Sequence, residues 1–283
     1  MSRLRAAGEV LLALAHVAFR AFRRFTALGQ LEVRSGWTLS PGIALAATAL
    51  LALACRPRGS AGAHGLHLRG AVHSVGSALV AMAVLAAFGV LALAAGIDLR
   101  PAAMGPRSGV LVFAGGLLAT AATLLVLERA DARPARAPPG PVLAILALLL
   151  LLPTLIAALG GRELGPVLQA TTWRFFAAGC GEEVFFRGYA QARLDAAFGR
   201  GWRWAGVAFG PGLPLAALLF GFVHVLNPYD YFGGGGEFAW WHGLTTVSMP
   251  YGFLFARCGS VVAPAVLHGL VDVLPLLFAA PPA

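Results

Sequence analysis

Long apolar runs, separated by short polar stretches, dominate this chain of 283 residues. About 20 apolar residues in a helix cross the hydrocarbon core of a bilayer. By that length the pattern predicts eight membrane spans: Trp37–Cys55, Ala71–Ile97, Ser108–Leu127, Pro141–Leu159, Val167–Arg187, Leu213–Leu226, Phe238–Ala256 and Val261–Ala280. The sixth is short unless Trp204–Phe209 joins it through a kink at the GPGLP stretch. The chain is therefore predicted to be an all-α, polytopic transmembrane helix bundle.

The segment before the first span, residues 1–36, has an amphipathic helical pattern. Its arginines and Glu9 fall on one side of a helix, and its leucines and phenylalanines on the other. A secretory signal peptide carries neither an acid inside its apolar region nor an arginine cluster directly after it. The segment is predicted to lie flat in the membrane interface, on the anionic cytoplasmic leaflet.

The polar stretch Arg129–Gly140 is the clearest linker in the chain. It divides the spans into N-terminal transmembrane helices, residues 37–140, and a C-terminal core, residues 141–283. A cytoplasmic N-terminus followed by five crossings puts the loop after the fifth span outside. The arginines of that loop favour the cytoplasm instead, by the positive-inside rule; they are Arg187, Arg193, Arg200 and Arg203. The two signals conflict.

The composition supports a membrane protein and narrows its partners. The chain is 59% hydrophobic and 12% charged, against about 25% charged residues in soluble domains. Its net charge of +9 comes from arginines between apolar runs, which indicates cytoplasmic loops and lipid headgroups rather than nucleic acid. Arginine without lysine indicates a GC-rich bacterial genome, and hence a multi-pass protein of the bacterial inner membrane. The three cysteines are too widely spaced for a disulfide framework or a thiolate metal site.

Ionisable residues inside predicted spans gather in the C-terminal half, where they are expensive and mark function or a structural pair. In the stretch CGEEVFFRGYAQ, Glu183 and Arg187 are four residues apart and face each other on a helix. Glu182 is rotated by about 100°. The helix thus offers one ion pair and one further carboxylate. The alternative is a structural ion pair with a glutamate at a helix end.

Two later spans carry histidines. His224 ends the stretch GFVH, and His268 lies four residues before Asp272, on the same helix face. Two histidines, a carboxylate and a second carboxylate behind one histidine can supply a general base or a metal-activated water. The alternatives are hydrogen-bonded structural histidines. The other histidines are predicted to lie in loops, on the amphipathic segment or near span ends: His16, His64, His67, His73 and His242.

Three motifs in this order resemble the CAAX protease and bacteriocin-processing (CPBP) family of intramembrane endopeptidases. They are EExxxR at Glu182, Glu183 and Arg187, FxxxH at Phe220 and His224, and HxxxD at His268 and Asp272. The resemblance covers residues 167–277. It implies that Glu182 activates the water that attacks the scissile carbonyl, that His224 and His268 position this water, and that Glu183 and Arg187 support the helix.

The resemblance also implies a membrane-associated protein or peptide substrate, and leaves its identity open. It admits a divalent metal, with zinc the expected ion, held by Glu182, His224 and His268. The last motif commonly ends in asparagine in this family. Asp272 cannot donate a hydrogen bond when ionised, which favours a role as a ligand or as a partner that orients His268.

Two other functions stay open from the sequence. A non-catalytic immunity or scaffold protein of the same fold would need none of the three candidate catalytic residues. A transporter could use buried carboxylates and histidines to relay protons or bind a cation. Against a transporter, the chain has no internal repeat.

Overall fold

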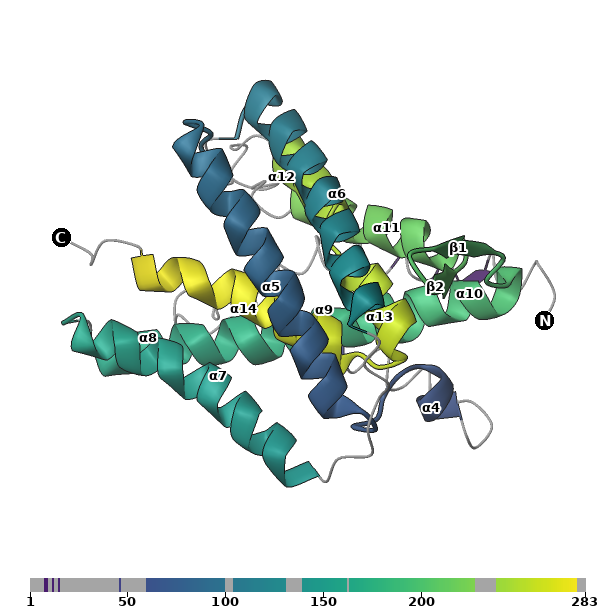
Figure 1. Cartoon of the computed structure of the whole chain (residues 1–283), viewed down its shortest axis with the longest axis horizontal. Helices are drawn as coiled ribbons and strands as arrows, with labels where there is room; N and C mark the ends of the chain where they lie inside the picture. The colour runs from purple at the N-terminus through teal and green to yellow at the C-terminus, as the bar shows by residue number, and fades with distance from the viewer. Residues whose placement is uncertain are drawn as a thin grey trace.

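The computed structural model describes residues 60–99, 104–130, 139–161, 163–226 and 238–278, with a few isolated positions before residue 60. Helices make up most of this part of the chain (Figure 1). They are α4 (Ser60–Ala63), α5 (Ala71–Ala94), α6 (Pro106–Arg129), α7 (Pro139–Leu159), α8 (Leu164–Thr172), η2 (Trp173–Cys180), α9 (Gly181–Glu183), η3 (Val184–Gln191), α10 (Ala192–Phe198), α11 (Gly212–Leu226), α12 (Trp240–Val247), α13 (Tyr251–Cys258) and α14 (Val262–Phe278).

Five of these segments, from α8 to α10, follow one another without a break between Leu164 and Phe198. They replace the predicted fifth span, Val167–Arg187, and extend beyond both of its ends. Two segments, η2 and η3, are π-helices, and they flank the short α-helical turn that holds Glu182 and Glu183. π-helical turns are rare and frequently occur at functional sites.

The predicted spans two to four correspond to α5, α6 and α7. Among the described residues, α5 and α6 are long and apolar enough to cross a bilayer, by length and composition. The helix α11 and residues 262–273 of α14 are shorter apolar segments. The predicted first span and most of the amphipathic segment 1–36 lie outside the described residues, so the eight spans stay a prediction.

The possible extension of the sixth span and the predicted seventh span differ from a continuous helix. Residues 202–209 do not extend α11 but form the antiparallel strands β1 (Trp202–Trp204) and β2 (Val207–Phe209). The turn between them, Ala205 and Gly206, has positive φ at both positions, which is the two-residue turn that suits a hairpin. The predicted seventh span, Phe238–Ala256, is broken into α12 and α13 at residues 248–250. The break contains Pro250, and a proline disfavours helical geometry in the residue before it.

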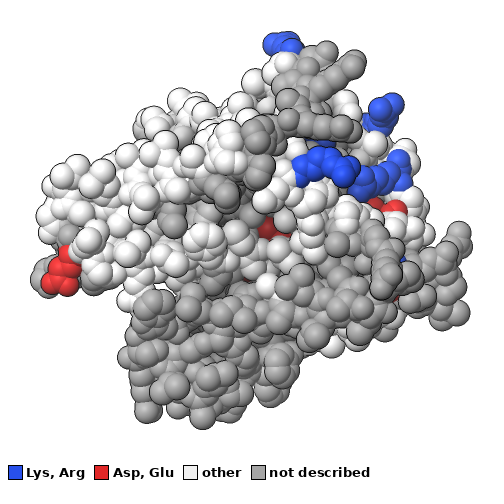
Figure 2. All heavy atoms as spheres, turned by 90° about the horizontal axis from the view of Figure 1, so that it is seen from below, with Lys and Arg blue, Asp and Glu red and all other residues white. Residues whose placement is uncertain are grey.

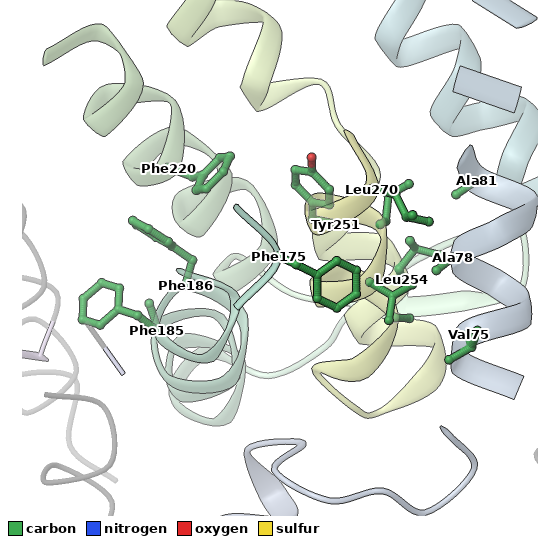
Figure 3. Packing of buried hydrophobic residues seen from close by; sticks show 14 of the residues in the cluster. Val75, Ala78, Ala81, Phe175, Phe185, Phe186, Phe220, Tyr251, Leu254 and Leu270 are labelled. Atoms are coloured by element: carbon green, nitrogen blue, oxygen red, sulfur yellow. The ribbon is translucent and has the colours of Figure 1, made fainter. Parts of the chain in front are cut away.

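The core lies where α14 crosses η2 and packs on α5. Figure 3 shows the phenylalanines of η3 and α11 on one side of α13 and α14, the small residues of α5 on the other, and Phe175 of η2 between them. A Cβ atom on Gly179 would lie 2.9 Å from the backbone nitrogen of Gly269, and one on Gly269 would lie 2.6 Å from the Phe175 ring. Glycines at these two positions therefore let η2 and α14 approach closely, which sets the position of His268.

Candidate active site

Glu183 lies at the centre of a buried polar cluster. Its Oε2 atom is 3.2 Å from Nε of Arg187, the ion pair that the four-residue spacing predicts. The side chains are 0% and 1% exposed. The guanidinium also lies over two aromatic rings, 4.5 Å from the centroid of Phe220 and 5.1 Å from that of Tyr251. These contacts stabilise the cation in apolar surroundings, so Arg187 joins η3 to α11 and α13.

His268 meets the same carboxylate from α14. Its Nδ1 atom donates a hydrogen bond to Oε1 of Glu183 at 2.9 Å, across 85 residues of sequence. Its Nε2 atom is 3.7 Å from Oδ2 of Asp272, one helical turn further on. The sequence predicted that His268 and Asp272 share one face of a helix. The contact that joins α14 to the helix of the EExxxR motif is the hydrogen bond from His268 to Glu183.

Rings hold His268 in place on its other sides. The ring of Tyr251 stacks on it, with centroids 5.1 Å apart and an interplanar angle of 27°. The ring of Phe220 meets it edge-on at 5.4 Å. An imidazole that is stacked, hydrogen-bonded and 3% exposed keeps one orientation, and its Nε2 side faces the partly exposed Asp272.

His224 has a defined tautomer. Its Nδ1 atom lies 2.9 Å from the carbonyl oxygen of Phe220, one turn earlier in α11. A carbonyl oxygen can only accept, so Nδ1 carries the hydrogen and the neutral ring keeps a lone pair on Nε2. His224 can therefore act as an acceptor towards a water molecule or a substrate N–H.

Glu182 is the second carboxylate of the motif and is 4% exposed. It lies within electrostatic range of His224 on α11 and of His268 and Asp272 on α14. The six residues predicted from the sequence therefore occupy one region of the structure. Its buried side holds Glu183, Arg187 and His268, and its more open side holds His224 and Asp272.

His242 is a neighbour of this site that the sequence interpretation placed elsewhere. Its ring lies 5.5 Å from that of His224, nearly perpendicular to it. The contact depends on a close crossing of α11 and α12, since a Cβ atom on Gly221 would lie 2.7 Å from the carbonyl oxygen of Gly243. The one signal in the sequence is a glycine near each histidine, three residues before His224 in GFVH and directly after His242 in WHG.

The other histidines lie outside the cluster. His64 is buried, and its Nδ1 atom donates to the carbonyl oxygen of Gly188 at 2.6 Å, which ties the segment before α5 to η3. His73 lies on α5, His67 lies in the loop before it, and His16 is outside the described residues.

The donor atoms do not form a ready metal site. Among the residues that the structure describes, no three His, Cys, Asp or Glu side chains are arranged to hold a metal ion. His268 directs Nδ1 to Glu183 and His224 directs Nδ1 to its own helix. Of the two imidazoles, only the Nε2 atoms are left for a ligand role, and zinc held by Glu182, His224 and His268 stays a prediction.

Residues 164–274 match the family model of type II CAAX prenyl endopeptidase Rce1-like proteins. This part of the chain is similar to Rce1-like proteins. The match begins at α8, ends within α14 and contains all six predicted site residues as well as His242. No curated protein and no solved structure matches the chain.

The family match agrees with the resemblance drawn from the three motifs. Rce1-like proteins are an integral membrane family, and the match over residues 164–274 supports a membrane setting and a function of the CAAX protease kind. The apolar helices α5 and α6 suit that setting. The helices before residue 164 lie outside the match; α5 packs on α14, α6 on α12 and α7 on α8 (Figure 1).

Proposed function

We propose that the chain is an intramembrane endopeptidase that hydrolyses a peptide bond of a membrane-associated or C-terminally anchored substrate, with Glu182 as the general base. The observation that carries the proposal is the different surroundings of the two adjacent carboxylates. Glu183 is held by Arg187 and His268. Glu182 lies within electrostatic range of both His224 and His268.

In this scheme Glu182 takes a proton from a water molecule as the water oxygen attacks the scissile carbonyl carbon. The lone pair on Nε2 of His224 accepts the second hydrogen of the water and fixes its direction. A new C–O bond forms, and the carbonyl oxygen takes up the negative charge.

His268 is suited to stabilise that charge. With carboxylates near both of its ring nitrogens, the imidazolium form can keep its Nδ1 hydrogen on Glu183 and donate from Nε2 to the oxyanion. Such a donor, fixed before the reaction, contributes about 10²–10³ to the rate of an acyl-transfer enzyme. The C–N bond then breaks, and Glu182 returns its proton to the leaving amine.

Zinc takes no part in this scheme. A metal held by Glu182, His224 and His268 stays a prediction from the sequence, and the arrangement of their donor atoms does not favour it. Metal analysis of the purified protein tests it.

The experiment compares wild type with Glu182→Gln in cells and then in proteoliposomes. Mass spectrometry of the membrane fraction identifies cleaved ends that appear only with the wild type, and a peptide spanning one such site serves as the assay substrate. Loss of a general base lowers the rate by about 10²–10⁴. Glu163→Gln is the matched control, because Glu163 is an exposed carboxylate at the start of α8.

Three results would overturn the proposal. Near-normal turnover by Glu182→Gln would remove Glu182 as the base. No cleavage by the wild type in either setting, with the protein folded, would favour the non-catalytic scaffold. Cation or proton flux into proteoliposomes without cleavage would favour the transporter.

A further inference from the structure

The β1–β2 hairpin presents large aromatic side chains at the surface. Trp202 and Trp204 are 50% and 41% exposed, although Trp202 also contacts Phe209 edge-on and Trp204 contacts Phe253 of α13. Side chains alternate along a strand, so Arg203, between them, points to the opposite face. Tryptophan is enriched where the membrane meets water, because its ring is apolar and its N–H is polar.

The hairpin lies at the end of a candidate membrane span. The last residues of α6 are Glu128 and Arg129, after a long apolar run. A Cβ atom on Gly206, in the hairpin turn, would lie 3.4 Å from Oε1 of Glu128. Arg257 at the end of α13 donates to the carbonyl oxygen of Leu127 at 2.6 Å. If α6 crosses the bilayer, these contacts put the hairpin at headgroup level.

Among the described residues, one arginine at this end of the molecule is paired and another is not. Arg200 donates to the buried carboxylate of Asp195 at 3.1 Å, and that carboxylate also accepts from the backbone of Gly212 at 3.0 Å. Arg203 is exposed and makes no hydrogen bond or ion pair with the described residues. Figure 2 shows most of the basic side chains visible on one face gathered towards one end of the described surface.

One ion pair places the N-terminal segment at the same end. Glu9 receives two hydrogen bonds from Arg193 of α10, from Nε and from Nη2, the latter at 2.6 Å. Both side chains are partly exposed. An ion pair cannot join groups on opposite sides of a bilayer. Glu9 and the arginine-rich loop therefore share one side, and the five crossings predicted between them cannot all occur.

We propose that the β1–β2 hairpin and the end of α10 form an interfacial anchor on the cytoplasmic side, where Arg203 binds the headgroups of anionic phospholipids. Trp202 and Trp204 set its depth in the headgroup layer. This assignment satisfies the positive-inside rule and the predicted cytoplasmic position of the N-terminal segment together. It stands independently of the chemistry proposed for Glu182.

The sidedness is tested by cysteine labelling in intact cells. Gly201→Cys lies before β1 and Gly105→Cys lies at the other end of α6, and a side chain at either position meets open space. Both are made in full-length protein with Cys55, Cys180 and Cys258 replaced by alanine. A membrane-impermeant maleimide should label Gly105→Cys from outside and Gly201→Cys only in inside-out vesicles. Labelling of Gly201→Cys from outside would overturn the proposal.

Lipid binding is measured by native mass spectrometry of the full-length protein with phosphatidylglycerol, phosphatidylcholine or inorganic phosphate. The wild type should retain phosphatidylglycerol preferentially, and phosphate should not compete with it. Arg203→Gln should weaken retention about fivefold, which corresponds to about 1 kcal/mol for one arginine near an anionic surface. The control is Arg107→Gln, an exposed arginine at the start of α6. Equal losses in both variants, or none in Arg203→Gln, would refute the lipid site.

Discussion

Replacing Arg187 with alanine tests whether a buried ion pair holds η3, α11 and α14 together. The substitution removes the cation 3.2 Å from Glu183 and leaves that fully buried carboxylate with His268 as its remaining charged contact. It also removes the contacts over the rings of Phe220 and Tyr251. Breaking a buried pair by removing one partner costs about 3–5 kcal/mol, because the other charge is stranded.

The expected loss can be read as a melting temperature. For domains of 150–250 residues, 1 kcal/mol corresponds to about 2–4 °C, so Arg187→Ala should melt about 6–20 °C below the wild type. The assay is intrinsic fluorescence during heating of the purified protein in detergent. Glu182→Gln should shift the melting temperature less, because it leaves the pair between Glu183 and Arg187 intact.

A double variant separates charge from packing. Glu183→Gln with Arg187→Met removes both charges and keeps most of the volume, and such exchanges of a buried pair are often neutral or stabilising. It should regain most of the stability that Arg187→Ala loses. If Arg187→Ala melts at the wild-type temperature but cannot cleave substrate, the stabilising role is wrong and Arg187 acts in the reaction.

Three further predictions concern the open side of the site. Asp272→Asn should keep the cleavage rate within about fivefold of wild type, since a partly exposed ion pair contributes roughly 1 kcal/mol or less. The zinc titration of this variant should overlap that of wild type. A roughly 10–100-fold fall in zinc affinity would instead indicate that Asp272 is a metal ligand. His242→Gln should lower kcat about 10–100-fold by misplacing His224 at unchanged melting temperature, whereas its control His73→Gln should not; equal kcat values would contradict this. Chelation should leave cleavage intact, and loss restored by zinc would return the metal to the mechanism.

The sequence predicted the parts of the site that depend on a single helix. The spacing of Glu183 and Arg187, and that of His268 and Asp272, requires only 3.6 residues per turn, and both pairs lie near each other as expected. Contacts between helices were beyond such reasoning. The bond from His268 to Glu183 spans 85 residues and exists because α14 crosses η2 at two glycines.

A turn and a proline explain where the predicted spans differ from the structure, because both interrupt helices that apolar length alone predicts. The sequence admits Trp204–Phe209 as an extension of the sixth span, yet the Ala205–Gly206 turn folds residues 202–209 into a hairpin. Pro250 divides the predicted seventh span, and the break leaves α12 free to cross α11. That crossing brings His242 beside His224. Because the sequence predicts the seventh span as one unbroken helix, His242 was not expected to be a neighbour of His224.

The histidines on the two sides of the site share a structural feature that links packing to chemistry. His268 is followed by Gly269 and His242 by Gly243, and each glycine lies at a helix crossing where a Cβ atom would clash. Small residues let helices approach closely inside a membrane, where apolar burial does not drive helix association. A histidine beside such a glycine is therefore carried to the neighbouring helix, where a polar partner can meet it. In this chain the motif residues supply the reactive groups, and the glycine crossings supply the distances at which those groups can act together.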